Sequence, residues 1–182
     1  MSEWFETLDG LRGEIWRRLR TGAESGGGSR VVALATVGGR GAEARMVALR
    51  EARVEAAELE VQTDLLSAKV DELRAEPRAT LLSWEPEALL QARLRVRVEV
   101  VTEGLDGRWA AMPDEARRNH GGLPPPGRPM KRAEDYVETR ERERLAVLLA
   151  RVEEIDAVHL GDLHRRALFT RDDGFAGRWI AP

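Results

Sequence analysis

The chain has 182 residues, of which 42% are hydrophobic, so residues 1–182 suit one domain with its own core. Its 29 basic and 32 acidic side chains give a net charge of −3, which argues against nucleic-acid or membrane-surface partners. The absence of cysteine excludes disulfides and thiolate sites, and the three histidines lack metal-ligand spacing. With no secretory signal or membrane-spanning run in the sequence, we expect a cytoplasmic protein.

The first third of the chain predicts a helix followed by a β-meander. Apolar residues recur at helical spacing near the start and predict an amphipathic helix over residues 3–20. Three β-rich segments follow, at residues 31–37, 42–49 and 59–63. A short helix should then begin at Ser67 and end before Pro77, because the residue before a proline avoids the helical region.

The clearest strand covers residues 93–101, after a strand predicted over residues 78–84. Apolar residues alternate strictly with Arg93, Arg95 and Arg97 along it. This period of two predicts one buried face and one face turned to water, a ligand or a partner.

The last third of the chain mixes loop, helix and strand signals. We expect a helical turn over residues 106–111, a Gly/Pro-rich loop over 112–130, a helix over 135–151, and strands over 155–160, 166–170 and 175–180. Long loops in compact domains are often functional, so the 112–130 loop is a candidate wall of a substrate cleft. Six or seven antiparallel strands predict a mainly β fold with peripheral helices, and closing them into a barrel removes exposed edges.

Two neighbouring segments carry side chains suited to a phosphate. Residues 45–50 read Arg-Met-Val-Ala-Leu-Arg, and Arg45 at a strand start can form two parallel hydrogen bonds to a phosphate. Residues 62–64 end a strand before Ser67-Ala68-Lys69 opens a helix, whose free N–H groups and dipole favour an anion. Taken alone, each segment also fits a plain role, as a solvated strand-end charge or an N-cap serine beside a solvated lysine.

Together the two segments resemble pyridoxamine 5'-phosphate oxidase and its relatives. In that family an Arg-x-Val-Leu-x-Lys/Arg strand precedes a Tyr/His-Thr-Asn/Asp turn, a Ser-x-Lys and a short helix ending in Asn-Pro-Arg. The match here runs from about residue 30 to residue 102 and includes Glu76-Pro77-Arg78, with a looser match over residues 155–182. The resemblance implies an antiparallel split β-barrel that binds FMN, and a homodimer in which two subunits build each flavin site.

The resemblance also assigns roles to single residues. It implies that Arg45 and Lys69 hold the FMN phosphate and that Ser67 assists them. Arg50 matches a basic residue that meets flavin or substrate. The residues expected along the flavin are Met46, Val47, Gln62 and Thr63.

Further flavin contacts are implied from the strands after residue 90. Gln91 or Arg93 matches a glutamine that reaches the ring from the second subunit. Arg166 matches an arginine at the pyrimidine edge of the ring, where a positive charge stabilises the reduced flavin. The arginine face that contains Arg93 fits a seam between subunits, since a charged face needs a partner or water.

The substrate motifs of the oxidase are not kept. Its Arg-x-His near the C-terminus is replaced by Asp162-Leu163-His164, and its substrate-phosphate clamp has no match near Trp109, Pro113 and Arg117. The sequence is therefore more similar to the family's uncharacterised FMN-binding branch. It predicts an FMN-dependent oxidoreductase with a substrate other than a vitamin B6 phosphate. The alternatives are a non-catalytic flavin protein for storage or sensing, and a related barrel that binds a deazaflavin or haem.

Overall fold

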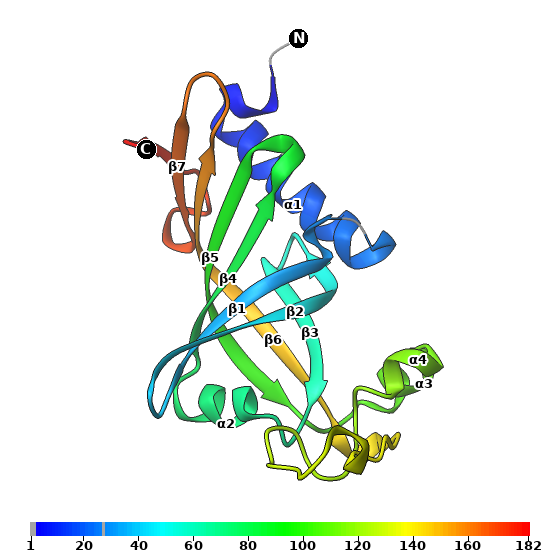
Figure 1. Ribbon diagram of the computed structural model, residues 1–182. Coiled ribbons are helices and arrows are strands. Elements are labelled where there is room, and N and C mark those ends of the chain that lie inside the picture. The colour runs from blue at the N-terminus through cyan, green and yellow to red at the C-terminus, as the bar shows by residue number, and fades with distance from the viewer. Residues whose placement is uncertain (1–2, 27) are drawn as a thin grey trace.

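The computed structural model describes residues 3–26 and 28–182 and shows a β-barrel with helices around it (Figure 1). The strands are β1 (Val31–Gly38), β2 (Gly41–Arg53), β3 (Glu58–Asp64), β4 (Arg78–Glu85), β5 (Leu90–Val101), β6 (Leu145–His159), β7 (Arg165–Thr170) and β8 (Arg178–Ile180). The helices are α1 (Leu8–Ser25), α2 (Ala68–Ala75), α3 (Asp106–Ala111) and α4 (Asp114–Arg117).

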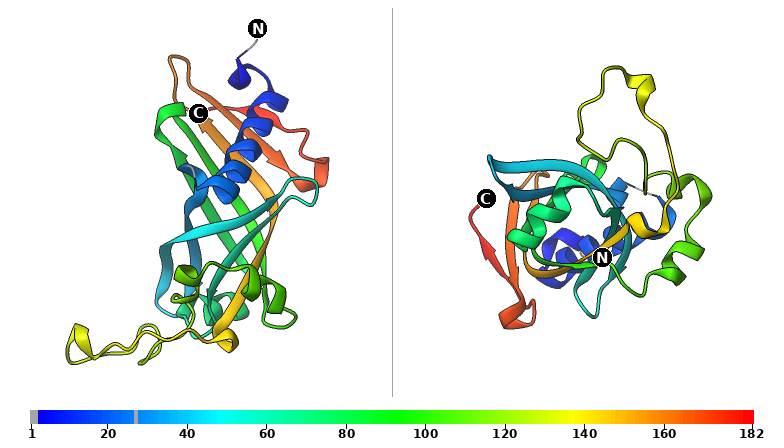
Figure 2. Two further views of the ribbon diagram at one scale, coloured as in Figure 1. Left: turned by 90° about the vertical axis from the view of Figure 1, so that its right-hand side faces the viewer. Right: turned by 90° about the horizontal axis from the view of Figure 1, so that it is seen from below.

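Six of the strands close into a barrel in the order β3-β2-β1-β4-β5-β6, and β3 pairs with β6 to complete it. All of these pairings are antiparallel, and β7 and β8 extend the sheet beyond β6. Closure leaves the barrel strands without free edges. The predicted fold class, a mainly β antiparallel split barrel with peripheral helices, is confirmed. Helix α2 lies at one end of the barrel and α1 runs along the other half (Figures 1 and 2).

The N-terminal helix is displaced from the predicted residues 3–20. Thr7 is its N-cap, with Oγ1 accepting a hydrogen bond from Gly10 N at 3.0 Å, and a 3₁₀ turn precedes it. The helix ends at Ser25 because Gly26 takes the left-handed conformation, with a φ of 79°. One face of α1 is buried in the barrel core, through Leu11, Ile15, Trp16 and Leu19.

The helix predicted over residues 135–151 is wrong, because residues 145–159 form β6, the longest strand. Both faces of β6 are covered. Leu148 faces the barrel core, whereas Val147 joins a second apolar cluster. That cluster consists of Leu105, Met112, Leu145 and Val147. A strand buried on both faces lacks the alternation that distinguishes strand from helix, so its apolar run was ambiguous.

The alternation in β5 is confirmed, but its outer arginines are already paired within the chain. The inward residues Leu94, Val96 and Val98 are buried. The outward arginines bind acids of β6 across the ladder: Arg93 with Asp156, Arg95 with Glu154 at 3.2 Å and Arg97 with Glu153 at 3.3 Å. The charge on this face therefore does not by itself require a second subunit.

The Gly/Pro-rich segment includes a short helix and then leaves the barrel. Helix α4 opens it, and the chain from His120 onward forms an arm that extends away from the barrel before β6 begins (Figure 2). The two sides of the arm meet in an isolated bridge between Leu123 and Val137. Within residues 3–26 and 28–182, no helix is long and apolar enough to cross a membrane.

Candidate functional site

A cavity of about 410 Å³ lies where β2, β3, the start of α2 and the base of the arm meet. Its lining residues are Arg45, Met46, Val47, Ala48, Arg50, Gln62, Thr63, Asp64, Ser67, Lys69, Asn119, His120 and Pro126. Every cofactor contact predicted within residues 45–69 is among them. The structure thus brings both phosphate-suited segments to one place, and adds residues of the arm.

Arg45 is positioned by the barrel end and by α2. It shares the inward face of β2 with buried Val47. Its Nη2 donates to Glu72 Oε2 of α2 at 2.8 Å, and its Nη1 donates to the Thr36 hydroxyl. These contacts hold the guanidinium in one orientation, and its Nε makes no hydrogen bond to another described residue.

Lys69 lies in the first turn of α2 and turns towards β3. Its Nζ donates to Thr63 Oγ1 at 3.0 Å. Burial, together with the positive charge of Arg45, lowers the pKa of Lys69. Two like charges held within interaction range in a half-buried cavity are stabilised by an anion bound between them.

Arg50 has a buried hydrogen-bond donor that is not satisfied within the described part of the chain. Its Nε is buried and has no hydrogen-bond partner among the described residues. Burial and the charge of Arg30 lower the pKa of its guanidinium. A buried donor without an acceptor is costly, so Arg50 fits a ligand that brings an acceptor to it.

Asp64 and His120 also line the cavity, and the sequence analysis assigned a ligand role to neither. Asp64 forms a buried ion pair with Arg144 at 2.8 Å and accepts from Gly121 N at 2.8 Å. The His120 ring lies with Nδ1 3.1 Å from the Thr63 carbonyl oxygen. These bonds tie the base of the arm to the end of β3. The residues of each pair are far apart in sequence, so a local sequence pattern cannot predict these contacts.

The other predicted contacts, Gln91, Arg93 and Arg166, do not line this cavity. They gather on the outer face of the sheet, where Gln91 and Arg166 both lie opposite Val158. Arg166 binds buried Asp156 through two hydrogen bonds of 2.9 and 2.8 Å, and Arg93 binds the same carboxylate. Hydrogen bonding to Arg166 and the charges of both arginines hold the pKa of Asp156 below its usual range.

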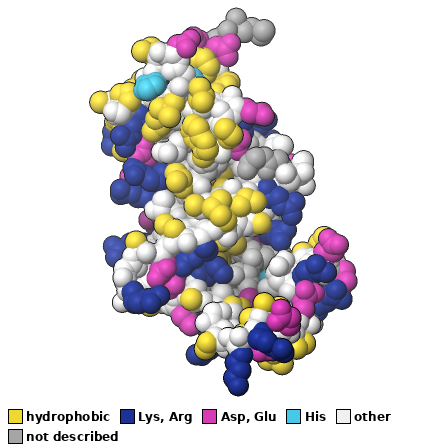
Figure 3. All heavy atoms as spheres, in the orientation of Figure 1, with side chains coloured by type: hydrophobic (Ala, Val, Ile, Leu, Met, Phe, Trp, Pro, Cys, Tyr) yellow, Lys and Arg dark blue, Asp and Glu magenta, His cyan; other side chains and the backbone are white. Residues whose placement is uncertain are grey.

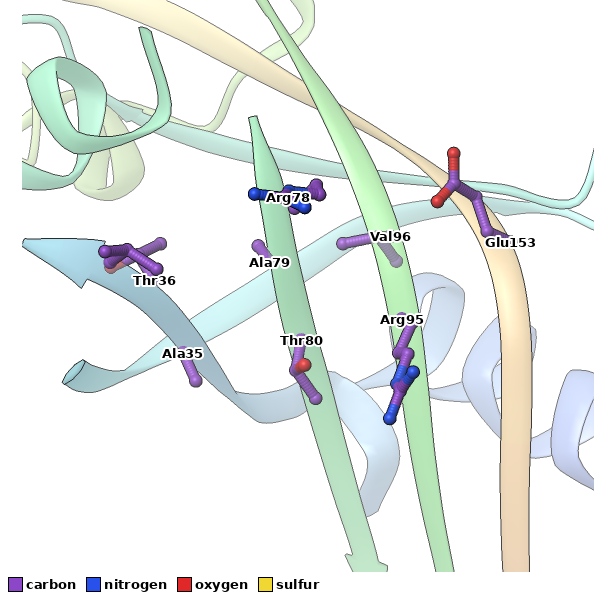
Figure 4. Close-up of a pocket in the computed structure, with 9 residues that line it drawn as sticks. Ala35, Thr36, Arg78, Ala79, Thr80, Arg95, Val96 and Glu153 are labelled. Atoms are coloured by element: carbon purple, nitrogen blue, oxygen red, sulfur yellow. The ribbon is translucent and has the colours of Figure 1, made fainter. Parts of the chain in front are cut away.

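A groove of about 380 Å³ lies on the outer face over β1, β4 and β5. Thr80 of β4 and Arg95 of β5 oppose each other there, with Arg78 nearer the β4 start (Figure 4). Arg78 is paired with Glu76 at 2.6 Å, and Arg95 is paired with Glu154. In the cavity Arg45 also has an acidic partner, Glu72, but Lys69 forms no ion pair with a described residue and Arg50 Nε has no acceptor, so the cavity suits an anion better than this groove.

Three cations line the cavity, whereas its one carboxylate, Asp64, is neutralised by Arg144. Among the described residues, no group of His, Asp or Glu side chains has the arrangement of a metal site. The fold is that of a split-barrel protein, and the lining of this cavity has the charge that suits an anionic ligand.

Comparison with known proteins also indicates a split barrel. Residues 14–102 match the family model described as pyridoxamine 5'-phosphate oxidase, FMN-binding domain. This match and the shared fold confirm the resemblance to the pyridoxamine 5'-phosphate oxidase-related split barrels. No curated protein is similar in sequence to this chain.

Several solved structures are similar in fold to this chain. A pyridoxamine 5'-phosphate oxidase-related, FMN binding protein from Nostoc punctiforme is 24% identical, with a TM-score of 0.77 over 94% of this chain and 97% of its own. PhzG from Burkholderia lata, in complex with tetrahydrophenazine-1-carboxylic acid, is 17% identical, with a TM-score of 0.72 over 93% and 91%. General stress protein 26 from Bacillus anthracis is 12% identical, with a TM-score of 0.55 over 81% and 92%.

Proposed function

We propose that the protein binds FMN in the cavity at Arg45 and Lys69 and is an FMN-dependent oxidoreductase of the cytoplasm. The observation that carries the proposal is the convergence of these two cations from separate elements beside the unpartnered Nε of Arg50. The match to an FMN-binding family model covers all three residues. The loss of the oxidase's substrate motifs supports a substrate other than pyridoxamine phosphate.

In this proposal the chain supplies binding and orientation. Arg45 and Lys69 hold the phosphate, helped by Ser67 and the first N–H groups of α2. Arg50 meets an acceptor of the ligand. Gln62 and Thr63 lie along the ligand from β3. Bound FMN would supply the electron transfer itself.

Gln91, Arg93 and Arg166 reach a flavin in this proposal only from a second copy of the chain. They share the outer face with large exposed apolar side chains, among them Met46, which is 62% exposed, and Trp84, which is 46% exposed. One cross-strand row on this face runs Met46, Ala33, Leu82, Arg93 and Asp156. Figure 3 shows hydrophobic side chains gathered over β1 and over the β4–β5 hairpin. We therefore propose a homodimer that covers this face.

Charge placed on the apolar face should separate the subunits. Leu82→Arg combined with Trp84→Arg is expected to convert a dimer into a monomer, because two cations would be buried against an apolar surface. Light scattering after size-exclusion chromatography measures this. Val137→Arg, on the exposed arm, is the control and should leave the mass unchanged. A wild-type protein that runs as a monomer, or a double variant that stays dimeric, contradicts the proposed interface.

The function is tested with purified protein and added FMN. We expect a flavin absorbance band that bleaches on addition of NADPH or NADH and returns in air, with negligible oxidation of pyridoxamine phosphate. Bound flavin that neither donor reduces favours a binding protein without turnover. A protein that does not bind FMN refutes the proposal, and the spectra of deazaflavin and haem identify those alternatives.

A further inference from the structure

We infer that His120 is a hydrogen-bond acceptor for the bound flavin, using its Nε2 atom to take a hydroxyl or ring N–H of the ligand. The inference rests on the proposed binding of a flavin in this cavity. It gives a ligand-recognition role to the arm, through a histidine at its base.

The His120 ring is held in one orientation. Its Nδ1 lies 3.1 Å from the Thr63 carbonyl oxygen, and the edge of the ring packs against Trp109 with the ring centroids 6.1 Å apart. A carbonyl oxygen only accepts, so Nδ1 carries the hydrogen. In the neutral ring, Nε2 then presents a lone pair.

The groups around His120 keep the ring neutral. The side chain is 1% exposed, and burial lowers the pKa of His120. Arg50 lowers this pKa further, whereas the Thr63 carbonyl and Asp64 raise it. The opposing effect of Asp64 is limited, because its carboxylate is already paired with Arg144.

The charged side chains of the cavity supply donors but no free acceptor. Arg45, Arg50 and Lys69 only donate. Asp64 accepts from Arg144 and from the backbone N–H groups of residues 66 and 121. His120 is hydrogen-bonded to the described part of the chain through Nδ1, and Nε2 makes no such bond there. A flavin brings acceptors on its phosphate and donors on its ribityl chain and ring N3, so Nε2 complements the second kind.

The test compares three flavins by fluorescence quenching. His120→Asn keeps a donor near the Thr63 carbonyl but lacks Nε2, and it should weaken FMN and riboflavin binding by about tenfold each. Lumiflavin has no ribityl chain. If its affinity is unchanged in the variant, the donor is a ribityl hydroxyl, and an equal loss assigns the ring N–H. His164→Asn, in the β6–β7 turn, is the matched control and should bind all three as the wild type does.

The outcomes separate this inference from the proposed function. If wild-type protein binds neither FMN nor riboflavin, the proposed function fails. If the wild type binds both and His120→Asn binds them equally well, only the role of His120 is overturned. Lys69→Ala should weaken the binding of FMN but not that of riboflavin, because riboflavin has no phosphate.

Nitrogen-15 NMR of the wild-type protein gives a second readout, in which the variant serves only to assign signals. The chain has three histidines, so the spectrum of His120→Asn assigns the His120 signals by their loss. We expect the Nδ1–H tautomer, and a shift of the Nε2 resonance when FMN is added. An Nε2–H tautomer, or an Nε2 resonance that FMN does not move, overturns the inference.

Discussion

Replacing Arg45 and Lys69 together by alanine should give folded, colourless protein whose affinity for FMN is at least about a hundredfold lower. Each charge-assisted hydrogen bond to the phosphate contributes about 1.5–3 kcal/mol, and about 1.4 kcal/mol corresponds to a tenfold change in affinity. The effect is large because both cations are half-buried in one cavity, where solvent screening is reduced. Fluorescence titration measures the FMN affinity, and circular dichroism verifies the fold.

The matched control carries the same two residue types outside the cavity. Arg128 and Lys131 are exposed on the arm, so their double alanine variant should bind FMN as the wild type does. Because Arg45 also pairs with Glu72, its removal leaves the Glu72 carboxylate without a counter-charge. Adding Glu72→Gln to the test variant removes that unpaired charge. Stoichiometric FMN retained by the variant without Arg45 and Lys69 would reject the phosphate assignment.

The second large effect is expected from the buried ion pair between Asp64 and Arg144. Asp64→Asn should lower the free energy of unfolding by about 3–5 kcal/mol, because it leaves the buried guanidinium without its counter-charge. It also weakens the attachment of Gly121 to the end of β3. Urea unfolding followed by circular dichroism measures the change.

An exposed pair provides the comparison. Asp114 lies 3.2 Å from Arg140, but both side chains are largely solvent-accessible, so Asp114→Asn should change the free energy of unfolding by less than about 1 kcal/mol. Asp64→Leu with Arg144→Met should recover the part of the lost stability that comes from the unpaired charge, because it removes both buried charges, but not the part that comes from the hydrogen bonds of Gly121 and Leu66 N–H. If Asp64→Asn and Asp114→Asn lower the free energy of unfolding equally, the pair of Asp64 and Arg144 is not desolvated.

The sequence by itself determined the features that depend on neighbours along the chain. Strict alternation identified β5, and the proline at residue 77 marked the end of α2. The spacing from Arg45 to Lys69 predicted one anion-suited site, because a strand and the helix start after the next strand meet at the same barrel end. These are local rules of backbone geometry, whereas the split barrel was implied by the family resemblance.

Only the tertiary structure decided the features that depend on distant partners. β6 is a strand because the barrel covers one face and the cluster around Leu105 the other, which removes the periodicity that sequence reasoning needs. Asp64 meets Arg144, and His120 meets the Thr63 carbonyl, across long stretches of chain. Arg93 and Arg95 of β5 lie opposite their acidic partners in β6 because of the ladder register. Such pairings arise from closure of the sheet, and no segment read alone contains both members.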